Sequence, residues 1–412
     1  MPDSRRLIEV LMTKQRVILV LNAGSSSVKF AVYQSPVAGG PLGSPQLTGE
    51  LSGLGGRSRL QVSGEHGQVD QPVALPATNF HVAGLSLVLD TVAEAVGEAA
   101  IVAVGHRVVH GGEAFTGPTH ITPAVLEALK GLMPLAPLHM PHNLAAIELV
   151  ARRLPGVPQI ACFDTAFHQT CPAVARRLAI PRHFHDDGLK RYGFHGLSYE
   201  FIVDRLRQVP GGLPRRMVLA HLGAGASLCG VLDGRSITTT MGYTPLDGLV
   251  MATRSGSIGP GAVLALQSRF GLSAAETERL LTHESGLLGV SGISGDIRVL
   301  LASDSVAAAE AVELFCRSIV RETAAAAAEL GGLEGFVFTG GIGANSPEIR
   351  SRICQALSWL GVSLDQAANQ TPAGEGRIDT GGPVSVWALA TDEQAIIAAA
   401  VARLLGGRHD EC

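Results

Sequence analysis

The sequence contains little lysine, no excess of positive charge and no long apolar run. Its only lysines are Lys14, Lys29, Lys130 and Lys190, so arginine, the better bidentate partner for phosphate and carboxylate, supplies most of the positive charge. The net charge is −4, and nothing suggests the basic stripe of a nucleic-acid surface. No uncharged apolar stretch reaches the ~18 residues of a membrane-spanning helix. We therefore expect neither nucleic acid nor a membrane among its partners.

The six cysteines are scattered, and they form neither a CxxC pair nor a Cys/His metal spacing. Dispersed cysteines in a chain of 412 residues are typical of reduced cytosolic proteins rather than of a disulfide framework. Glu9 interrupts the apolar patch near the start, which makes that segment a poor signal peptide. We expect a cytoplasmic protein of two or three domains.

The motifs of several large enzyme classes are also missing. Three glycine turns follow apolar, strand-like runs, at Gly24, at Gly223 to Gly225 and at Gly340 to Gly343. None reads GxxxxGK[ST], and none is a GxGxxG that opens a helix, so P-loop NTPases and Rossmann dehydrogenases are disfavoured. Neither GxSxG nor HExxH occurs, which argues against α/β-hydrolases and zincins.

One pattern occurs twice, about half a chain apart. Residues 17–33 predict a strand, a glycine turn with serines and a second strand, and residues 217–232 repeat this order. Small residues at the tip of such a hairpin let backbone N–H groups and hydroxyls approach an anion. The repeat suggests a duplicated domain, although an ordinary polar hairpin would read the same way.

Charged residues follow several of the predicted strands. Arg107 and Asp164 come after buried strands, Arg254 lies in a long glycine-rich loop, and His139 and His195 lie in short loops. Each has a simpler interpretation, such as a surface arginine, a core histidine or a helix cap. Together they indicate a two-lobed α/β protein that binds a phosphorylated small molecule, and the residues alone lead no further.

Two predicted helix starts lie near the end of the chain. The glycines at 340–343 form a turn before a helix whose N-cap is Ser346, a place where a nucleotide phosphate can bind. Thr391 and Gln394 predict a capping box that puts Glu393 in the first turn of the last helix.

The motifs together resemble the acetate kinase family of the actin/Hsp70/sugar-kinase superfamily, from about Val17 to about Leu405. The matching strings, in order, are LNAGSSSVKF, GHRVVHGG, LAPLH, PHN, FDTAFH, RYGFHGLS, HLGAGASL, MGYTPLDGL, TRSG, SGLLGVSG, FTGGIGANS and TDEQ.

The resemblance implies an α/β fold of two duplicated ribonuclease-H-like lobes, mixed sheets flanked by helices, around a central cleft. It places the first lobe, on the acyl and phosphate side, at residues 16–164 plus 395–412, and the nucleotide lobe at residues 165–394, with residues 1–15 as an extension. It implies phosphorylation of acetate by ATP, with ADP and acetyl phosphate as products, and the reverse, in a homodimer that uses Mg²⁺.

The same resemblance implies roles for individual residues. Asn22 and Glu393 match the metal-site positions. The catalytic matches are Arg107, His139, Asp164, His195 and Arg254. Arg107 also matches the substrate site, with Val109, Leu138, Phe194 and Pro245 as the pocket for the acyl methyl group. The matches to nucleotide contacts are His221, Gly223, Gly225, Asp296, Arg298, Gly341, Ile342 and Asn345.

The chain departs from the family pattern at several positions. Ala224 stands where the family usually has asparagine, Ala344 where it has glutamate, and Ser257 and Gly259 where it has two aspartates. Ala252 replaces a glycine, and Met140 follows His139 in place of asparagine. Loss of the polar group at Ala224 bears on nucleotide affinity and on the choice of phosphoryl donor. Two alternatives stay open: a propionate or butyrate kinase, and a non-catalytic nucleotide-binding protein of the actin/Hsp70 class.

Overall fold

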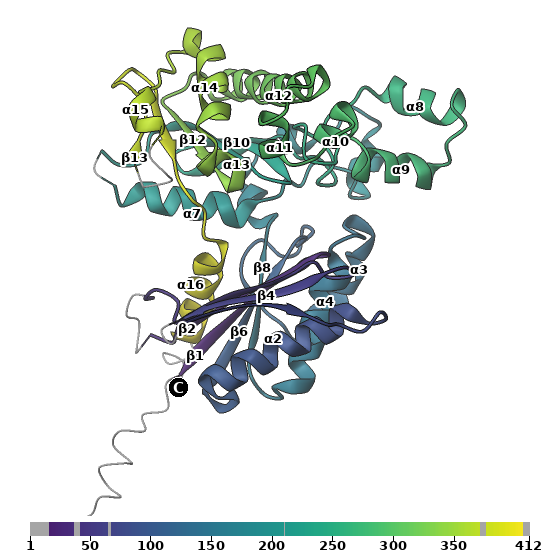
Figure 1. The fold of residues 1–412 in the computed structure, drawn as a ribbon, viewed down its shortest axis with the longest axis vertical. Coiled ribbons are helices and arrows are strands. Elements are labelled where there is room, and N and C mark those ends of the chain that lie inside the picture. Colours follow the sequence, from purple (N-terminus) through teal and green to yellow (C-terminus); the bar gives the residue numbers. More distant parts are fainter. Residues whose placement is uncertain (1–15, 37–41, 65–66, 210, 371–375, 407–412) are drawn as a thin grey trace, which may run out of the picture. The chain divides into compact units, whose positions relative to one another are not determined.

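The computed structural model describes residues 16–36, 42–64, 67–209, 211–370 and 376–406. The chain divides into two compact units, Met1–Ala166 with Asp392–Cys412 (unit 1) and Phe167–Thr391 (unit 2). Figure 1 labels their helices and strands. The predicted extension at residues 1–15 lies outside the described residues.

Unit 1 is built on one mixed sheet with the order β5-β4-β3-β2-β1-β6-β8-β7. β1 and β2 form the predicted antiparallel hairpin, with Val17 opposite Gln34 and Ala23 opposite Val28. β6 and β8 run parallel to β1, because helical segments connect these strands. The strands are β1 (Val17–Ala23), β2 (Ser27–Gln34), β3 (Leu47–Ser52), β4 (Ser58–Gly64), β5 (Gly67–Val73), β6 (Ile101–Val108), β7 (Thr119–His120) and β8 (Gln159–Phe163).

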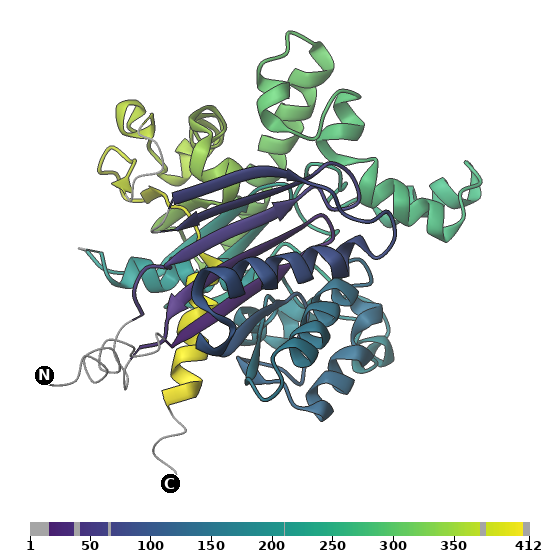
Figure 2. The same ribbon diagram turned by 60° about the horizontal axis from the view of Figure 1, so that its bottom comes forward.

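Helices cover both faces of this sheet. Alternate residues of β1, such as Val17, Leu19 and Leu21, pack with apolar residues of α2 and α4, and α2 crosses that face in Figure 2. α16 packs on the opposite face, against β1 and β6. The helices are α2 (Phe80–Val96), α3 (Pro123–Gly131), α4 (Met140–Arg153) and α16 (Glu393–Gly406), with 3₁₀ turns at Glu98–Ala100 and Met133–Leu135.

Gly105 of β6 permits the close approach of α16. A Cβ at this position would lie 2.5 Å from Cγ2 of Ile397 and 2.9 Å from Cγ2 of Val401, closer than carbon atoms pack. The absence of a side chain at Gly105 therefore lets α16 lie directly on β6.

Unit 2 has a six-stranded sheet with the order β11-β10-β9-β12-β14-β13. β9 and β10 form the second predicted hairpin, and β12 and β14 continue the sheet parallel to β9. Unit 2 therefore repeats the arrangement of unit 1, which confirms the predicted duplication and the mixed α/β class. The strands are β9 (Arg216–Leu222), β10 (Ala226–Leu232), β11 (Arg235–Thr239), β12 (Gly335–Thr339), β13 (Gly376–Arg377) and β14 (Ser385–Ala388).

The helices of unit 2 surround this sheet. α7 supplies Tyr199, Ile202, Val203 and Leu206 to a core with β9 and β10, while the long helix α12 also packs on those strands. The helices are α5 (Ala173–Arg176), α6 (Arg182–Asp186), α7 (Gly196–Arg207), α8 (Pro260–Ser268), α9 (Ala274–His283), α10 (Gly286–Ser291), α11 (Ile297–Leu301), α12 (Val306–Leu330), α13 (Gly340–Asn345), α14 (Pro347–Ala356) and α15 (Gln366–Asn369), with 3₁₀ turns at Ala166–Thr170 and Ser358–Leu360.

Two local predictions are wrong. The glycines at 340–343 are not an open turn but part of the short helix α13, which ends before Ser346. Ser346 does precede Pro347 at the start of α14, yet its side chain makes no capping hydrogen bond. The predicted capping box at α16 is not formed, because Thr391 Oγ1 and Gln394 Nε2 have no hydrogen-bond partner. The backbone N–H of Ala395 donates to the Asp392 carboxylate. Among the described residues, no helix is both long and apolar enough to cross a bilayer.

Candidate active site

Four predicted site residues of unit 1 meet at one edge of its sheet. Asn22, Arg107 and Asp164 lie at or just after the carboxyl ends of the parallel strands β1, β6 and β8, and Glu393 begins α16. The carboxyl ends of parallel strands share one edge of a sheet, where ligand sites are commonly found. The fold thus gathers residues that are up to 371 positions apart in the chain (393 − 22).

Arg107 is the centre of this group. Its Nε and Nη2 donate to the two oxygens of Asp164 at 2.9 and 2.6 Å, and its Nη1 donates to Asn22 Oδ1 at 3.2 Å. Glu393 Oε2 lies 3.5 Å from Nε. The Asp164 side chain is 1% exposed and that of Arg107 24%, so the bidentate pair is shielded while the guanidinium keeps an open side.

Burial and charge act against each other in this cluster. Burial lowers the pKa of Arg107, but the charges of Asp164 and Glu393 outweigh it and raise that pKa above its ordinary value. Burial raises the pKa of Asp164, which the Arg107 guanidinium opposes. Arg107 therefore remains a cation whose plane is fixed by Asp164.

Asn143 of α4 ties the ends of two strands together beside this cluster. Its Nδ2 donates to the carbonyl of Ala23 at 2.7 Å, and its Oδ1 accepts from the N–H of Val109 at 3.0 Å. Ala23 follows Asn22 and Val109 lies two residues after Arg107, so this buried amide holds both backbones in register. Nothing in the sequence alone marks Asn143 for this role, although it lies in the PHN string.

The residues near Arg107 include oxygen ligands suited to Mg²⁺. Asn22 offers an amide oxygen and Glu393 a carboxylate, and both lie next to the same guanidinium. Within the described ranges, no group of three or more His, Cys, Asp or Glu side chains could form a metal cage. Mg²⁺ is usually held by one or two carboxylates together with water and substrate phosphates.

In unit 2, the loops beside β9 and β10 bring two histidines and Arg254 together. The rings of His195 and His221 stack with centroids 4.1 Å apart. A Cβ on Gly225 would lie 3.5 Å from His195 Nε2 and 3.7 Å from Arg254 Nη1, so these groups face the same glycine. His195 adopts a left-handed backbone conformation, φ 60°, which is uncommon for a residue with a side chain and frequent at functional sites.

Arg254 is partly buried and has few partners among the described residues. Its Nη1 donates to the carbonyl of Pro245 at 3.2 Å and lies 3.9 Å from the sulfur of Met251. Burial lowers the pKa of Arg254 below its ordinary value. A partly buried cation without a carboxylate partner among the described residues favours an anionic ligand.

Six of the eight predicted nucleotide residues surround one pocket of about 640 Å³ in unit 2. This volume lies within the range of small-molecule sites. The pocket is lined by Gly223, Ala224, Gly295, Asp296, Ile297, Arg298, Gly341, Ile342, Asn345 and Ser346, so His221 and Gly225 are not among its lining residues. Arg298 is held by Asp296 through Nε and Nη2, and Asn345 Nδ2 donates to the Gly341 carbonyl at 3.0 Å.

The departures from the family pattern have different surroundings. Ala224 lines this pocket, and its carbonyl accepts from the N–H of Ala252. Ala344 is buried, and its carbonyl accepts from the buried Arg350 at 2.7 Å. Ser257 donates to Asp247 at 2.5 Å, near the start of α8 rather than at Arg254. Of these three, Ala224 is the one placed to affect a bound nucleotide.

The predicted acyl-pocket residues are divided between the units. Val109 is buried and Leu138 is 39% exposed in unit 1, and Phe194 is buried in unit 2, where Pro245 accepts from Arg254. His139 lies at the N-cap of α4, without a side-chain capping bond.

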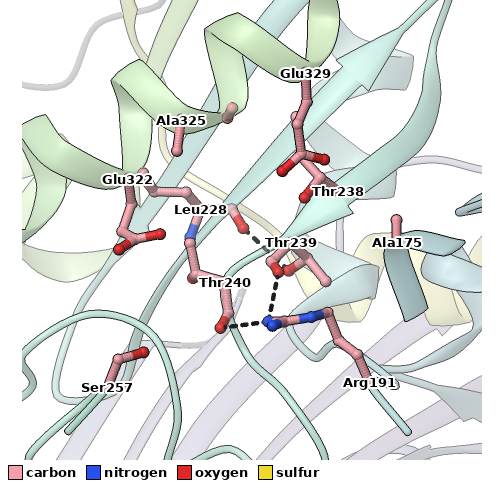
Figure 3. Close-up of a pocket in the computed structure, with 12 residues that line it drawn as sticks. Ala175, Arg191, Leu228, Thr238, Thr239, Thr240, Ser257, Glu322, Ala325 and Glu329 are labelled. Atoms are coloured by element: carbon pink, nitrogen blue, oxygen red, sulfur yellow. Dashed lines mark hydrogen bonds between the residues drawn. The ribbon is translucent and has the colours of Figure 1, made fainter. Parts of the chain in front are cut away.

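A second pocket in unit 2, of about 160 Å³, contains none of the predicted site residues (Figure 3). Arg191 enters it, but its Nη1 donates to the carbonyls of Thr239 and Thr240 at 3.0 Å. Glu322 and Glu329 of α12 lie on the other side of this pocket in Figure 3. Arg191 therefore holds the chain after β11, which leads toward Pro245.

The chain is similar to proteins of a known family. Residues 17–399 match the model of the acetokinase family. This chain belongs to the acetokinase family. It is 49% identical over 397 residues to the acetate kinase of Rhodopseudomonas palustris. The aligned region covers 95% of this chain and 99% of that relative.

Solved structures of this family share the fold. The acetate kinase of Porphyromonas gingivalis has a TM-score of 0.84 at 34% identity, covering 95% of this chain and 100% of that one. The propionate kinase of Francisella tularensis has a TM-score of 0.86 at 34% identity, covering 93% and 98%. The predicted family and fold class are confirmed.

Proposed function

We propose that this chain transfers the γ-phosphoryl group of ATP to acetate, giving acetyl phosphate and ADP, and that it catalyses the reverse reaction. The observation that carries the proposal is the Arg107–Asp164 pair beside Asn22 and Glu393, in a member of the acetokinase family. We assign the acyl and metal side to unit 1 and the nucleotide side to unit 2.

This reaction requires positioning of the reactants and stabilisation of charge rather than a general base. A carboxylate oxygen of acetate attacks the γ-phosphorus in line, a new P–O bond forms, and the bond to the β-phosphate oxygen breaks as ADP leaves. Acetate is already ionised at neutral pH, so no proton needs to be removed. Arg107 is suited to orient the acetate carboxylate, because Asp164 fixes the plane of its guanidinium. The guanidinium stays positively charged, and one side of it is open.

Asn22 and Glu393 would hold Mg²⁺, which neutralises phosphate charge when bound. In unit 2, Gly223 and Gly341 line the proposed nucleotide pocket and let phosphates approach the backbone. Arg254 and His195 face the same glycine and supply a cation and a hydrogen-bond donor to the phosphoryl group.

Propionate is the closest competing substrate. The similar Francisella structure bears the name of a propionate kinase, and one methylene typically changes discrimination by only about 1–3 kcal/mol. Butyrate is larger by a further methylene. A non-catalytic nucleotide-binding protein of the actin/Hsp70 class is disfavoured, because it has no use for the Arg107 cluster.

A hydroxamate assay with ATP, Mg²⁺ and each acid in turn tests the proposal. We expect acyl phosphate with acetate, a lower kcat/KM with propionate and little with butyrate. A higher kcat/KM for propionate would reassign the substrate, and no acyl phosphate with any acid would favour the binding protein.

Two further proposals concern the state of the protein. The buried thiols of Cys171, Cys229, Cys316 and Cys354, which form no disulfide, support a reducing, cytoplasmic location. Exposed apolar side chains on and beside α8, namely Ile258, Leu264 and Phe270, support a homodimer. Light scattering after size-exclusion chromatography would give twice the mass of 42.7 kDa for a dimer.

A further inference from the structure

The stacked histidines of unit 2 are held by two serines in a reciprocal arrangement. His195 Nδ1 lies 2.9 Å from Ser227 Oγ, and His221 Nδ1 lies 2.8 Å from Ser198 Oγ. Ser198 follows His195 by three residues, and Ser227 pairs with His221 in the β9–β10 ladder. Each histidine is therefore fixed by a serine from the segment that carries the other histidine.

Behind Ser227 lies a buried tyrosine. The hydroxyl of Tyr199 is 2.5 Å from Ser227 Oγ, and both residues are fully buried. Burial raises the pKa of Tyr199 well above its ordinary value, so the hydroxyl keeps its hydrogen. A backbone hydrogen bond from His221 lowers that pKa, as only a donor to the phenol oxygen does.

The hydrogen atoms in the series of hydrogen bonds from Tyr199 through Ser227 to His195 can be assigned. Tyr199 has one hydroxyl hydrogen, and Ser227 Oγ is the acceptor found for it among the described residues. Ser227 has one hydrogen, and its other described partner is His195 Nδ1. Ser227 therefore donates to Nδ1, which must be the unprotonated nitrogen of a neutral ring. The hydrogen of the ring is then on Nε2.

His168, elsewhere in unit 2, has the same arrangement, and here a backbone carbonyl shows which ring nitrogen carries the hydrogen. Its Nε2 lies 2.9 Å from the carbonyl of Phe194, which can only accept, so Nε2 carries the hydrogen. Its Nδ1 lies 2.8 Å from Ser236 Oγ, so in the neutral ring a serine donates to Nδ1 here too. Burial lowers the pKa of His168 to about 4, which keeps that ring neutral.

We propose that Ser227 and Tyr199 are positioning residues that fix His195 in the Nε2–H tautomer. Nε2 is the nitrogen that faces Gly225 on the side of Arg254. The inference rests on the proposed function in one respect, namely that this N–H donates to the transferring phosphoryl group. In the other tautomer Nε2 would present a lone pair, which repels a phosphoryl oxygen and leaves the hydrogen of Ser227 without an acceptor.

The first test reads the tautomer directly in the unmodified protein. In ¹⁵N-histidine-labelled full-length chain, two-bond ¹H–¹⁵N correlation spectra distinguish the two tautomers of each ring, and a His195→Gln variant assigns the signal. We expect His195 as the Nε2–H form near pH 7.5. The Nδ1–H form there would overturn the proposal whether or not the chain phosphorylates acetate, and lack of that activity with the Nε2–H form would instead overturn only the proposed function.

The second test separates positioning from packing. Ser227→Ala should lower kcat about tenfold with little change in the KM for ATP or acetate, because the N–H of His195 acts mainly in the transition state. Ser198→Ala, which removes the matching bond to His221, is the control and should change the KM for ATP more than kcat. Tyr199→Phe should have a smaller effect than Ser227→Ala, because Ser227 can still donate to Nδ1 although nothing then prevents it from accepting.

Thermal unfolding and the same ¹H–¹⁵N correlation spectra are measured for each variant. Retention of the pure Nε2–H form and of wild-type kcat in a folded Ser227→Ala protein would overturn the proposal. If Ser227→Ala does not fold, Ser227→Thr, which keeps the hydroxyl, and Tyr199→Phe replace it. A mixed tautomer in Tyr199→Phe supports the relay, and an unchanged Nε2–H signal with unchanged kcat contradicts the part assigned to Tyr199.

Discussion

The carboxyl edges of the two sheets have the same topology but carry different kinds of residue. In unit 1 the ends of β1, β6 and β8 present Asn22, Arg107 and Asp164, a cluster of formal charges and amide groups. In unit 2 the ends of β9 and β12 lead into Gly223 and Gly340, so glycines rather than charged side chains follow these strands. A duplicated fold supplies two equivalent edges, and the residues placed there decide what each can bind.

The largest expected difference concerns the two arginines. Arg107→Ala and Arg254→Ala should each lower turnover by roughly 10³-fold or more, because each removes a cation from the proposed phosphoryl transfer. Only Arg107→Ala should also lower the free energy of unfolding, by about 3–5 kcal/mol, because it leaves the Asp164 charge buried and unpaired. Arg254→Ala removes only the contacts of Arg254 with the Pro245 carbonyl and the Met251 sulfur, and neither of these groups is charged.

Steady-state kinetics and urea unfolding of both variants measure this difference. The double variant Arg107→Ala with Asp164→Asn is the control, which should recover stability without activity. Wild-type-like turnover in Arg254→Ala would remove that residue from the mechanism. Equal losses of stability in the two single variants would contradict the contrast between the edges.

Two neighbouring glycines sharpen the comparison within unit 2. Gly340 has φ 76°, and a Cβ there would lie 2.7 Å from the Leu222 carbonyl, so Gly340→Ala should destabilise the fold by about 1–3 kcal/mol. Gly341 has nothing within 4 Å of its Cβ position and lines the larger pocket. Gly341→Ala should therefore unfold like the wild type and raise the KM for ATP several-fold. Thermal unfolding and kinetics of this matched pair give the answer, and a wild-type KM for ATP would argue that phosphates do not approach Gly341.

Acid should weaken unit 1 more than unit 2. Burial lowers the pKa of His106 and His110 in unit 1, and of His168 in unit 2, to about 4. Between pH 6.5 and 4 the unfolded chain binds a proton at each site and the folded chain does not, so stability falls as the pH falls. The loss is on the order of 1–2 kcal/mol per histidine by pH 5.

Hydrogen exchange at pH 7 and pH 5, corrected for intrinsic rates, measures this loss separately in each unit. We expect the core strands of unit 1 to lose more protection than those of unit 2. His106→Gln, which cannot gain a proton, should reduce the loss in unit 1, and an unchanged pH response in that variant would show that His106 does not contribute.

The sequence predicted the hairpins, the duplication and the strands that carry Arg107 and Asp164, because apolar runs and glycine turns are local signals. Six of the eight residues that the family resemblance matched to nucleotide contacts line one pocket, and their role stays a prediction. It missed the helix α13 because its glycines signal a turn, whereas the buried Arg350 satisfies the last carbonyls of that helix. Asn143, Tyr199 and Ser227 act through contacts distant in the chain, which periodicity does not report.

The most direct test of the division between the edges is a crossed measurement of KM. Val109→Ala alters a residue beside the Arg107 cluster, and Gly341→Ala alters the pocket of unit 2. We predict that Val109→Ala raises the KM for acetate and leaves that for ATP within twofold, and that Gly341→Ala does the opposite. Parallel changes of both KM values in each variant would contradict the assignment of acetate to one edge and nucleotide to the other.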